Sequence, residues 1–398
     1  MISQYRKIFN EKFSEEKYEA FLKDLYTEHN HTTPFRISET PAFIPKQLKK
    51  QLLEACDEIM EVINQPNFKE LTQGAFLKPE IMVPNEDEAP KFLQLDFGIC
   101  LDENGQPIPK LIELQGFPSM YFFQELLERK YREHYEIPPR FSMHPNDLST
   151  DEFIALLREE IVGDTDPKQV ILLELTPHLQ ATAIDFYATV AHTGIKLLCL
   201  SDLKKRGKSL FYLDDDGNEV KVLKIYNRII FDELYQRDDI QREFHFTDEV
   251  DVEWIGHPNW FFRVSKYTMP FFNSKYVPNS YHLDKLETLP SDLENYVLKP
   301  LYSFAGAGVQ LQVTPEMIEG LTDKSNYLLQ QKVVYHPIIE TMDVPSKCEV
   351  RMMLLHCKKT NETKVISNLM RHSKGEMIGV QYNKDRTWVG ASVGFFED

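Results

Sequence analysis

The sequence predicts a mixed α/β fold, because segments with helical periodicity are followed by many strand-like apolar runs. Apolar residues recur at helical spacing over residues 18–26 and 45–63. Farther along, residues 169–174 and 195–200 are strand-like runs on either side of an amphipathic stretch at 179–193. This β-α-β order indicates two parallel strands joined by a right-handed crossover.

The first 70 residues are expected to form a helical N-terminal segment. Between its two helical stretches lies a polar stretch that contains His29 and His31. Two histidines two positions apart, with no third ligand nearby, favour a surface or structural role over a metal site.

A polar pattern follows in a predicted hairpin, with strands at 92–99 and 110–115 and a turn at 102–105. If the strands are regular, Asp96, Glu113 and Gln115 point to one face. Oxygen ligands of this kind suit Mg²⁺, which takes carboxylates together with substrate phosphates. The alternative is that Asp96 and Glu113 are solvated charges of an ordinary hairpin.

The middle of the chain contains the β-α-β unit and a second hairpin around residues 214–218. Three acids beside Gly217 resemble a Ca²⁺ loop, but no bidentate glutamate follows at the required spacing, so a plain turn is favoured. The next predicted strand, 222–228, ends at Arg228.

Near the C-terminal end, a strand at 296–300 carries Lys299 and runs into a loop of small residues, which includes Ser303, Ala305, Gly306 and Gly308. A lysine at a strand end can meet a phosphate, and glycines let backbone N–H groups approach phosphate oxygens. Residues 309–313 alternate like a returning strand, so we expect a hairpin lid. An ordinary turn beside a solvated lysine is the alternative.

Three further strands are expected at 327–333, 349–355 and 367–371. The edge formed by Gln330, Gln331 and Val333 could hold a purine ring, and Arg351 and Arg371 could direct guanidinium groups at phosphates.

In this order of motifs the chain resembles the ATP-grasp superfamily, whose members join a carboxylate to an amine through an acyl phosphate. The acidic hairpin precedes the lysine strand, as in the eukaryotic-type glutathione synthetase and glutathionylspermidine synthase families. The resemblance implies a circularly permuted ATP-grasp fold with an inserted βαβ substrate domain. The expected parts are a helical segment at 1–70, metal-binding strands at 71–130, a substrate domain at 131–255 and a nucleotide-binding region at 256–398.

The resemblance also implies roles for single residues. ATP and two Mg²⁺ ions are the expected cofactors, with Lys266 and Lys299 on the nucleotide and Arg371, backed by Arg351, on the transferring phosphoryl group. Arg228 would face the substrate. The alternative for Lys266 is a solvated helix lysine.

Two departures from the family pattern leave the activity open. Gln115 stands where those families have asparagine, and the lid has Ser303 and no acid between Lys299 and Thr314. A nucleotide-binding protein that has lost ligase activity and a phosphotransferase are therefore alternatives to a ligase. The expected partners are a small-molecule carboxylate and an amine, and a homodimer is left open.

Composition excludes several further classes of protein. A formal net charge of −17 argues against nucleic-acid binding, which depends on a basic surface. The five cysteines have no metal-like spacing, and most lie in apolar strands, which favours core positions over a catalytic cysteine. No apolar run approaches transmembrane length and the N-terminus lacks a signal core, so no membrane partner and a cytoplasmic location are expected.

Overall fold

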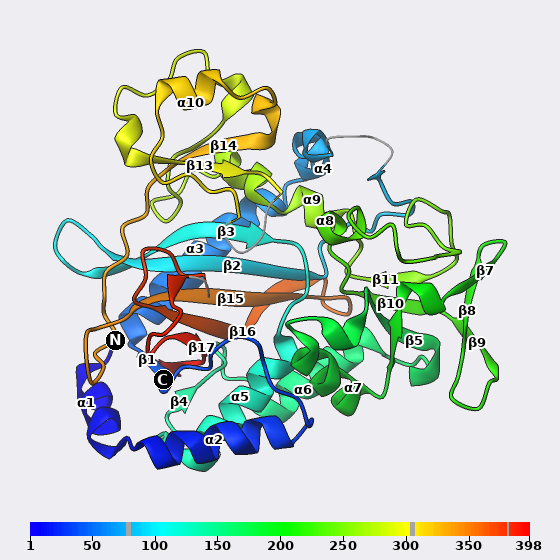
Figure 1. Cartoon of the computed structure of the whole chain (residues 1–398), viewed down its shortest axis with the longest axis horizontal. Coiled ribbons are helices and arrows are strands. Elements are labelled where there is room, and N and C mark those ends of the chain that lie inside the picture. The colour runs from blue at the N-terminus through cyan, green and yellow to red at the C-terminus, as the bar shows by residue number, and fades with distance from the viewer. Residues whose placement is uncertain (77–80, 303–306, 380–381) are drawn as a thin grey trace.

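The computed structural model describes residues 1–76, 81–302, 307–379 and 382–398. It confirms the mixed α/β class (Figure 1). None of the helices in these residues is both long and apolar enough to cross a bilayer.

A five-stranded sheet at the centre joins early and late parts of the chain. Its strand order is β17-β16-β15-β2-β3, with the pairs β16–β17, β15–β16, β2–β15 and β2–β3 all antiparallel. The strands are β2 (Phe92–Leu101), β3 (Pro107–Gln115), β15 (Lys347–Cys357), β16 (Glu362–Ser373) and β17 (Gly390–Ser392). The predicted acidic hairpin is therefore bonded directly to β15, which carries Arg351, and β15 is bonded in turn to β16, which carries Arg371.

The two faces of this sheet differ because side chains alternate along each strand. On β2, Leu93, Leu95, Phe97 and Ile99 belong to the core that also contains the apolar residues of α3 (Lys46–Ile63). Gln94 and Asp96 point to the opposite face, although both are almost fully buried. Helix α3 thus covers the apolar face, and polar side chains collect on the other.

A second, parallel sheet confirms the predicted β-α-β unit. Its order is β11-β10-β5-β6, built from β5 (Val170–Glu174), β6 (Lys196–Cys199), β10 (Lys224–Asn227) and β11 (Glu253–Ile255). The crossover helix α7 (Ala183–Thr193) ends at Gly194. Helix α6 (Thr150–Ile161) precedes the unit and begins with a capping box between Ser149 and Glu152. The second hairpin is present as β8 (Ser209–Leu213) and β9 (Glu219–Val222), beside β7 (Lys204–Arg206).

A third sheet forms a small unit at the top of Figure 1. Its order is β12-β14-β13, comprising β12 (Ser280–His282), β13 (Tyr296–Pro300) and β14 (Tyr327–Gln331), with α10 (Pro315–Glu319) and its own apolar core. We call this unit the upper unit. The prediction of a returning strand at 309–313 is wrong, because only Gln310 forms an isolated bridge with Leu298 and the ladder partner of β13 is β14.

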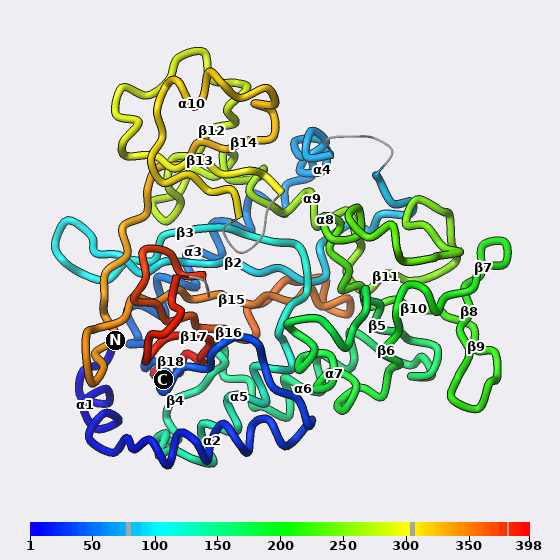
Figure 2. Tube along the Cα trace, viewed as in Figure 1, coloured from blue at the N-terminus to red at the C-terminus, as the bar shows by residue number. Residues whose placement is uncertain are grey.

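The two ends of the chain meet at the lower left of the trace (Figure 2). β1 (Ala42–Ile44) pairs in parallel with β18 (Gly394–Glu397), which also pairs with β4 (Phe141–Ser142). The predicted N-terminal helices are α1 (Ser3–Lys12), α2 (Glu15–Thr27) and α3, and α2 packs against α5 (Tyr121–His134). The short helices are α4 (Phe68–Leu71), α8 (Phe231–Leu234) and α9 (Trp260–Arg263).

Candidate functional site

Charged side chains from four neighbouring strands meet on the polar face of the central sheet. Asp96 of β2 is paired in register with Glu113 of β3 on one side and with Arg351 of β15 on the other. Two residues before Arg351, Glu349 is paired with Arg371 of β16. Directly paired residues, and residues two apart on one strand, share a face. The register alone therefore gathers these five groups.

Two arginines hold the buried carboxylates of this cluster. Arg351 donates to both oxygens of Asp96, from Nε at 2.6 Å and from Nη2 at 2.7 Å, and its Nη1 donates to Gln94 at 3.0 Å. Arg371 Nη2 donates to Asp96 Oδ2 at 2.6 Å and also contacts Glu349. The arginines are thus charge partners of the sheet itself, in addition to any part they take in binding.

The pKa values follow this pairing. Burial opposes charge on Asp96, but the positive charges of Arg351 and Arg371 outweigh it and keep the pKa of Asp96 below its ordinary value. Burial likewise opposes charge on Arg371, but Glu349 and Asp96 raise its pKa. For Glu349 burial wins, and its pKa is raised despite Arg371.

A bulge in β3 leaves a backbone carbonyl free to bond to the upper unit. Asp96 pairs with Glu113, but the next residue of β2 pairs with Leu111, so Ile112 is an extra residue in the ladder. A bulged residue is left without its ladder partner. The carbonyl oxygen of Ile112 instead accepts a hydrogen bond of 3.0 Å from Lys299 Nζ. This bond joins β13 of the upper unit to the edge of the central sheet.

Two lysines lie next to Glu113. Lys266, in the 3₁₀ helix Lys266–Phe271, places its Nζ 3.9 Å from Glu113 Oε2. Burial lowers the pKa of Lys266, and it lowers the pKa of Lys299 to about 8 even though Glu113 opposes the shift. A bound phosphate would favour the charged form of both lysines.

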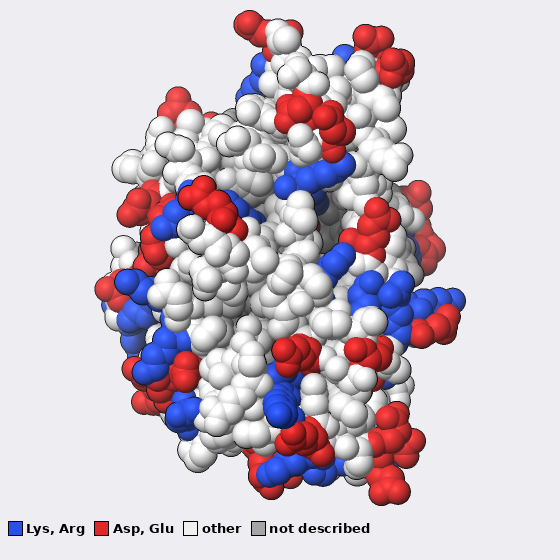
Figure 3. Space-filling model, turned by 90° about the vertical axis from the view of Figure 1, so that its left-hand side faces the viewer, with Lys and Arg blue, Asp and Glu red and all other residues white. Residues whose placement is uncertain are grey.

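These groups line one cavity between the upper unit and the central sheet. Its charged lining residues are Glu113, Lys266, Lys299, Glu349, Arg371 and Glu376, and its apolar lining residues include Ile112, Val297, Val309, Leu311 and Val333. We call it the charged cavity. Figure 3 shows the surface hollowed below the upper unit, with basic side chains at the margin of the hollow. A cavity lined by apolar side chains as well as by lysines and an arginine suits a molecule with a flat base and phosphates.

The other predicted nucleotide residues divide into three groups. Gln330 and Val333 line the charged cavity. Gln331 is exposed, and neither it nor Gly308 lines this cavity in the described part of the chain. Ser303, Ala305 and Gly306 lie outside the described residues.

The predicted metal ligands are not equivalent. Both oxygens of Asp96 accept from arginine, and the amide nitrogen of Gln115 donates to Gln94 rather than facing the charged cavity. The described residues contain no group of three or more histidine, cysteine or acidic side chains that could hold a metal. Glu113 faces the charged cavity with its side chain 29% exposed. One carboxylate with substrate phosphates is a common Mg²⁺ arrangement, so Glu113 is the ligand that fits.

Arg228 lies outside the charged cavity. Its guanidinium is buried between the rings of Phe117 and Phe186, 5.2 and 5.1 Å from their centroids, and 4.0 Å from Asp185. Its Nη2 is 3.5 Å from Thr182 Oγ1. Thr182 lines a second pocket, described below, so the predicted substrate role of Arg228 remains a prediction.

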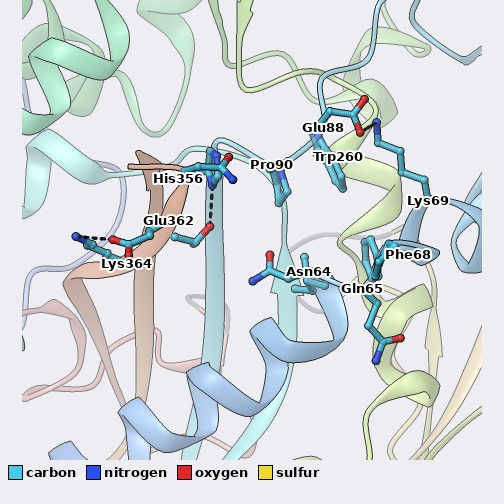
Figure 4. Close-up of a pocket in the computed structure, with 15 residues that line it drawn as sticks. Asn64, Gln65, Phe68, Lys69, Glu88, Pro90, Trp260, His356, Glu362 and Lys364 are labelled. Atoms are coloured by element: carbon cyan, nitrogen blue, oxygen red, sulfur yellow. Dashed lines mark hydrogen bonds and ion pairs between the residues drawn. The ribbon is translucent and has the colours of Figure 1, made fainter. Parts of the chain in front are cut away.

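The second pocket, of about 650 Å³, adjoins the charged cavity. Both are lined by Arg371, Ile378 and Gly379, so they meet at this arginine. A separate groove of about 740 Å³ lies near the ends of α3 and β15 (Figure 4). None of the predicted site residues lines that groove, and its lysines are paired, Lys69 with Glu88 and Lys364 with Glu362.

Sequence reasoning missed the roles of Glu349 and Tyr335. The spacing of Glu349 and Arg351, two apart on one strand, was a signal that both face the cluster. Tyr335 gave no such signal, because it follows β14 in an irregular segment. Its hydroxyl donates to Glu349 Oε2 at 2.9 Å, and its ring lies against Gly98, where a Cβ would come within 2.6 Å of the ring.

Replacing Tyr335 by phenylalanine should lower the free energy of unfolding by about 1–2 kcal/mol, because buried Glu349 loses a donor. Tyr327→Phe, in β14 and away from Glu349, is the matched control and should change little. Urea unfolding of both variants measures the difference. Equal midpoints would show that the Tyr335 hydroxyl does not support the cluster.

The fold is similar to that of solved structures. The chain is similar to a glutathione synthetase-like effector from Globodera pallida, solved in its apo form, with a TM-score of 0.60 and 13% sequence identity over 96% of each chain. No protein-family model matches the sequence, and no curated protein matches it either. At this identity the likeness concerns the fold alone. The protein has a glutathione synthetase-like fold.

Proposed function

We propose that the protein is a circularly permuted ATP-grasp enzyme that uses Mg-ATP to join a small-molecule carboxylate to an amine. One observation carries the proposal: Glu113, Lys266, Lys299 and Arg371, from separate parts of the chain, line one cavity together with apolar side chains. In this proposal the strands of 71–130 complete the nucleotide region of 256–398, and 131–255 forms the substrate domain.

The charged cavity defines what each group would do. The adenine would lie against the apolar side chains of Val297 and Val333, and the phosphates would contact Lys266 and Lys299. Glu113 would hold Mg²⁺, which neutralises phosphate charge when bound. The charged cavity measures about 180 Å³, below the usual range for ligand pockets, so it would have to widen to admit ATP.

Arg371 lines both the charged cavity and the second pocket, which supports a role for it in the transfer. A carboxylate oxygen of the substrate would bond to the γ-phosphorus, and the bond to the bridging oxygen would break so that ADP leaves with the electron pair. The amine nitrogen would then bond to the acyl carbon, phosphate would leave, and the nitrogen would lose a proton. Arg371 would stabilise negative charge in the first step.

ADP release is the direct test. The protein is incubated with Mg-ATP and a panel of amino acids, dipeptides and polyamines, singly and in pairs. A ligase releases ADP only when a carboxylate and an amine are both present. ADP release with a carboxylate or hydroxyl compound alone would indicate a phosphotransferase.

A nucleotide-binding protein without ligase activity is the second candidate. The contacts of Asp96 favour it, because both carboxylate oxygens are engaged by arginines, which leaves Glu113 as the one predicted metal-binding carboxylate that is not held by arginine in the described residues. This candidate predicts Mg-ATP binding without ADP release for any substrate pair.

Nucleotide binding should take up a proton at alkaline pH. Lys299 has a pKa lowered to about 8 by burial, so at pH 9 it is mostly neutral in the free protein. Phosphate beside it favours the charged form, so binding at pH 9 should take up a substantial fraction of a proton, and binding at pH 7 nearly none. Calorimetry in buffers of different ionisation enthalpy measures this uptake.

Two variants distinguish the positive charge of Lys299 from its ability to titrate. Lys299→Met should weaken ATP binding by roughly one to two powers of ten, since a charge-assisted contact is lost. Lys299→Arg keeps a charge that does not titrate and should lose the Lys299 share of the uptake. Unchanged ATP affinity in Lys299→Met would remove Lys299 from the nucleotide site.

A further inference from the structure

The second pocket is lined by more basic than acidic residues. The chain carries a net charge of −17, yet this pocket is lined by five cationic residues and a single acid, Asp385, and three of the five also pair with carboxylates outside the lining. The cationic residues are Arg36, Arg351, Arg371, Lys384 and Arg386. Its apolar residues are Pro34, Phe35, Met120, Leu369, Ile378, Val389 and Ala391. The combination suits an anionic molecule with an apolar part.

Two residues of this lining each carry a buried side-chain nitrogen that is unpartnered among the described residues. Arg371 Nε and His372 Nε2 have no hydrogen-bond partner within the described part of the chain. Burial lowers the pKa of His372 to about 3, so its ring is neutral, and its Nδ1 is already bonded to Ser38 Oγ at 3.0 Å. Arg371 and His372 are adjacent on β16 and point to opposite faces of the sheet, so only Arg371 Nε lies on the face of the charged cluster, where a polar ligand group would complete its hydrogen bonding.

The N-terminal segment forms one wall of this pocket. Ala391 donates to the carbonyl of Arg36 at 2.9 Å, and Ser38 donates to the carbonyl of Ala391 at 2.8 Å. Gly390 lies so close to the Arg36 carbonyl that a Cβ would collide with it. The wall is therefore fixed to β17 by backbone hydrogen bonds.

Two side chains of the wall are held in place. The ring of Phe35 meets Phe123 edge to face, with centroids 6.0 Å apart. Arg36 pairs with Glu39 and lies over the ring of Tyr18. Glu39 in turn accepts from the backbone N–H of Trp388 at 2.7 Å. Side chains held in this way bind at a lower entropic cost.

We propose that Phe35 and Arg36 determine substrate specificity, and that the second pocket binds the carboxylate substrate, an acidic small molecule with an apolar chain. This inference rests on the proposed function. The reacting carboxylate would lie at Arg371, where the pocket meets the charged cavity. The apolar chain would lie on Phe35 and Val389, and a further anionic group would lie near Arg36 and Arg386.

N-hexanoyl-L-glutamate is a suitable probe, because it combines two carboxylates with an apolar chain. Calorimetry without nucleotide should show binding to the wild type, with L-glutamate and hexanamide each bound at least about tenfold more weakly. Phe35→Ala should weaken probe binding by roughly tenfold, and Arg36→Gln by a similar factor. Mg-ATP affinity should stay unchanged in both variants.

Phe211→Ala and Arg206→Gln are the matched controls. Both residues lie in the β7–β9 sheet, and Arg206 is ion-paired there with Glu219, much as Arg36 is with Glu39. Neither control should alter probe binding. Phe35→Leu keeps an apolar side chain and should retain most of the affinity. It shows whether weak binding by Phe35→Ala is due to the lost contact or to loss of folding.

The outcomes separate this inference from the proposed function. No probe binding by the wild type, or wild-type binding by both Phe35→Ala and Arg36→Gln, would overturn the inference even if Mg-ATP binds. Probe binding that depends on Phe35 and Arg36 supports the inference even if ADP is never released. In that case the ligase proposal fails and the pocket assignment stands.

Discussion

Turnover of ATP should fall by about two orders of magnitude or more when Glu113 is replaced by glutamine, while thermal stability hardly changes. Glu113 is the proposed Mg²⁺ ligand, and a lost metal contact removes several kcal/mol of transition-state stabilisation. Its carboxylate is partly exposed, and the ion pair that the described residues give it, with Lys266, is as long as 3.9 Å, so little folding energy depends on it. ADP release and a melting curve measure the two effects.

The exposed Glu103, in the turn between β2 and β3, supplies the control variant Glu103→Gln. Wild type should gain melting temperature with Mg-ATP through ligand linkage, and Glu113→Gln should gain less. If Glu113→Gln melts far below wild type without ligand but keeps the full shift with Mg-ATP, Glu113 is a structural carboxylate. The proposed metal position would then be wrong.

Asp96→Ala should have the largest effect on stability, lowering the free energy of unfolding by about 3–5 kcal/mol at pH 7. Asp96 is 1% exposed and accepts from two arginines, so its removal leaves two buried charges without this partner. The pKa of Asp96 is held below its ordinary value, so its contribution is complete above about pH 4 and is lost as the pH falls through the folded-state pKa.

Denaturant unfolding at pH 7 and at lower pH tests both the size and the sign of this effect. Asp57→Ala, at an exposed aspartate of α3, is the matched control and should lie within about 0.5 kcal/mol of wild type. The gap between Asp96→Ala and wild type should narrow below about pH 4. A gap that is absent at pH 7, or that widens on acidification, would contradict the buried charge cluster.

The same contacts change one expectation for Arg371. From the sequence, Arg371 and Glu113 are both expected to matter for chemistry and little for stability. In the structure Arg371 pairs with Asp96 and Glu349, two buried carboxylates. Removing it should therefore cost stability as well as turnover, and Glu113 is the position that tests chemistry cleanly.

Local patterns in the sequence determined the elements and the faces of the strands. Period-two alternation placed Asp96 and Glu113 on strands, and helical spacing placed α2 and α3 within a few residues of their observed ends. The β-α-β order determined the parallel sheet. These features depend on residues close together in the chain, so local sequence is enough to specify them.

Only the tertiary structure decided how the distant parts meet. The pairing of β2 with β15 sets Asp96 opposite Arg351, 255 residues later, and turns a proposed metal ligand into an arginine partner. The bulge at Ile112 and the contact of Tyr335 with Glu349 are likewise products of packing. Register, bulges and long-range contacts depend on how whole sheets pack, and no local pattern encodes that.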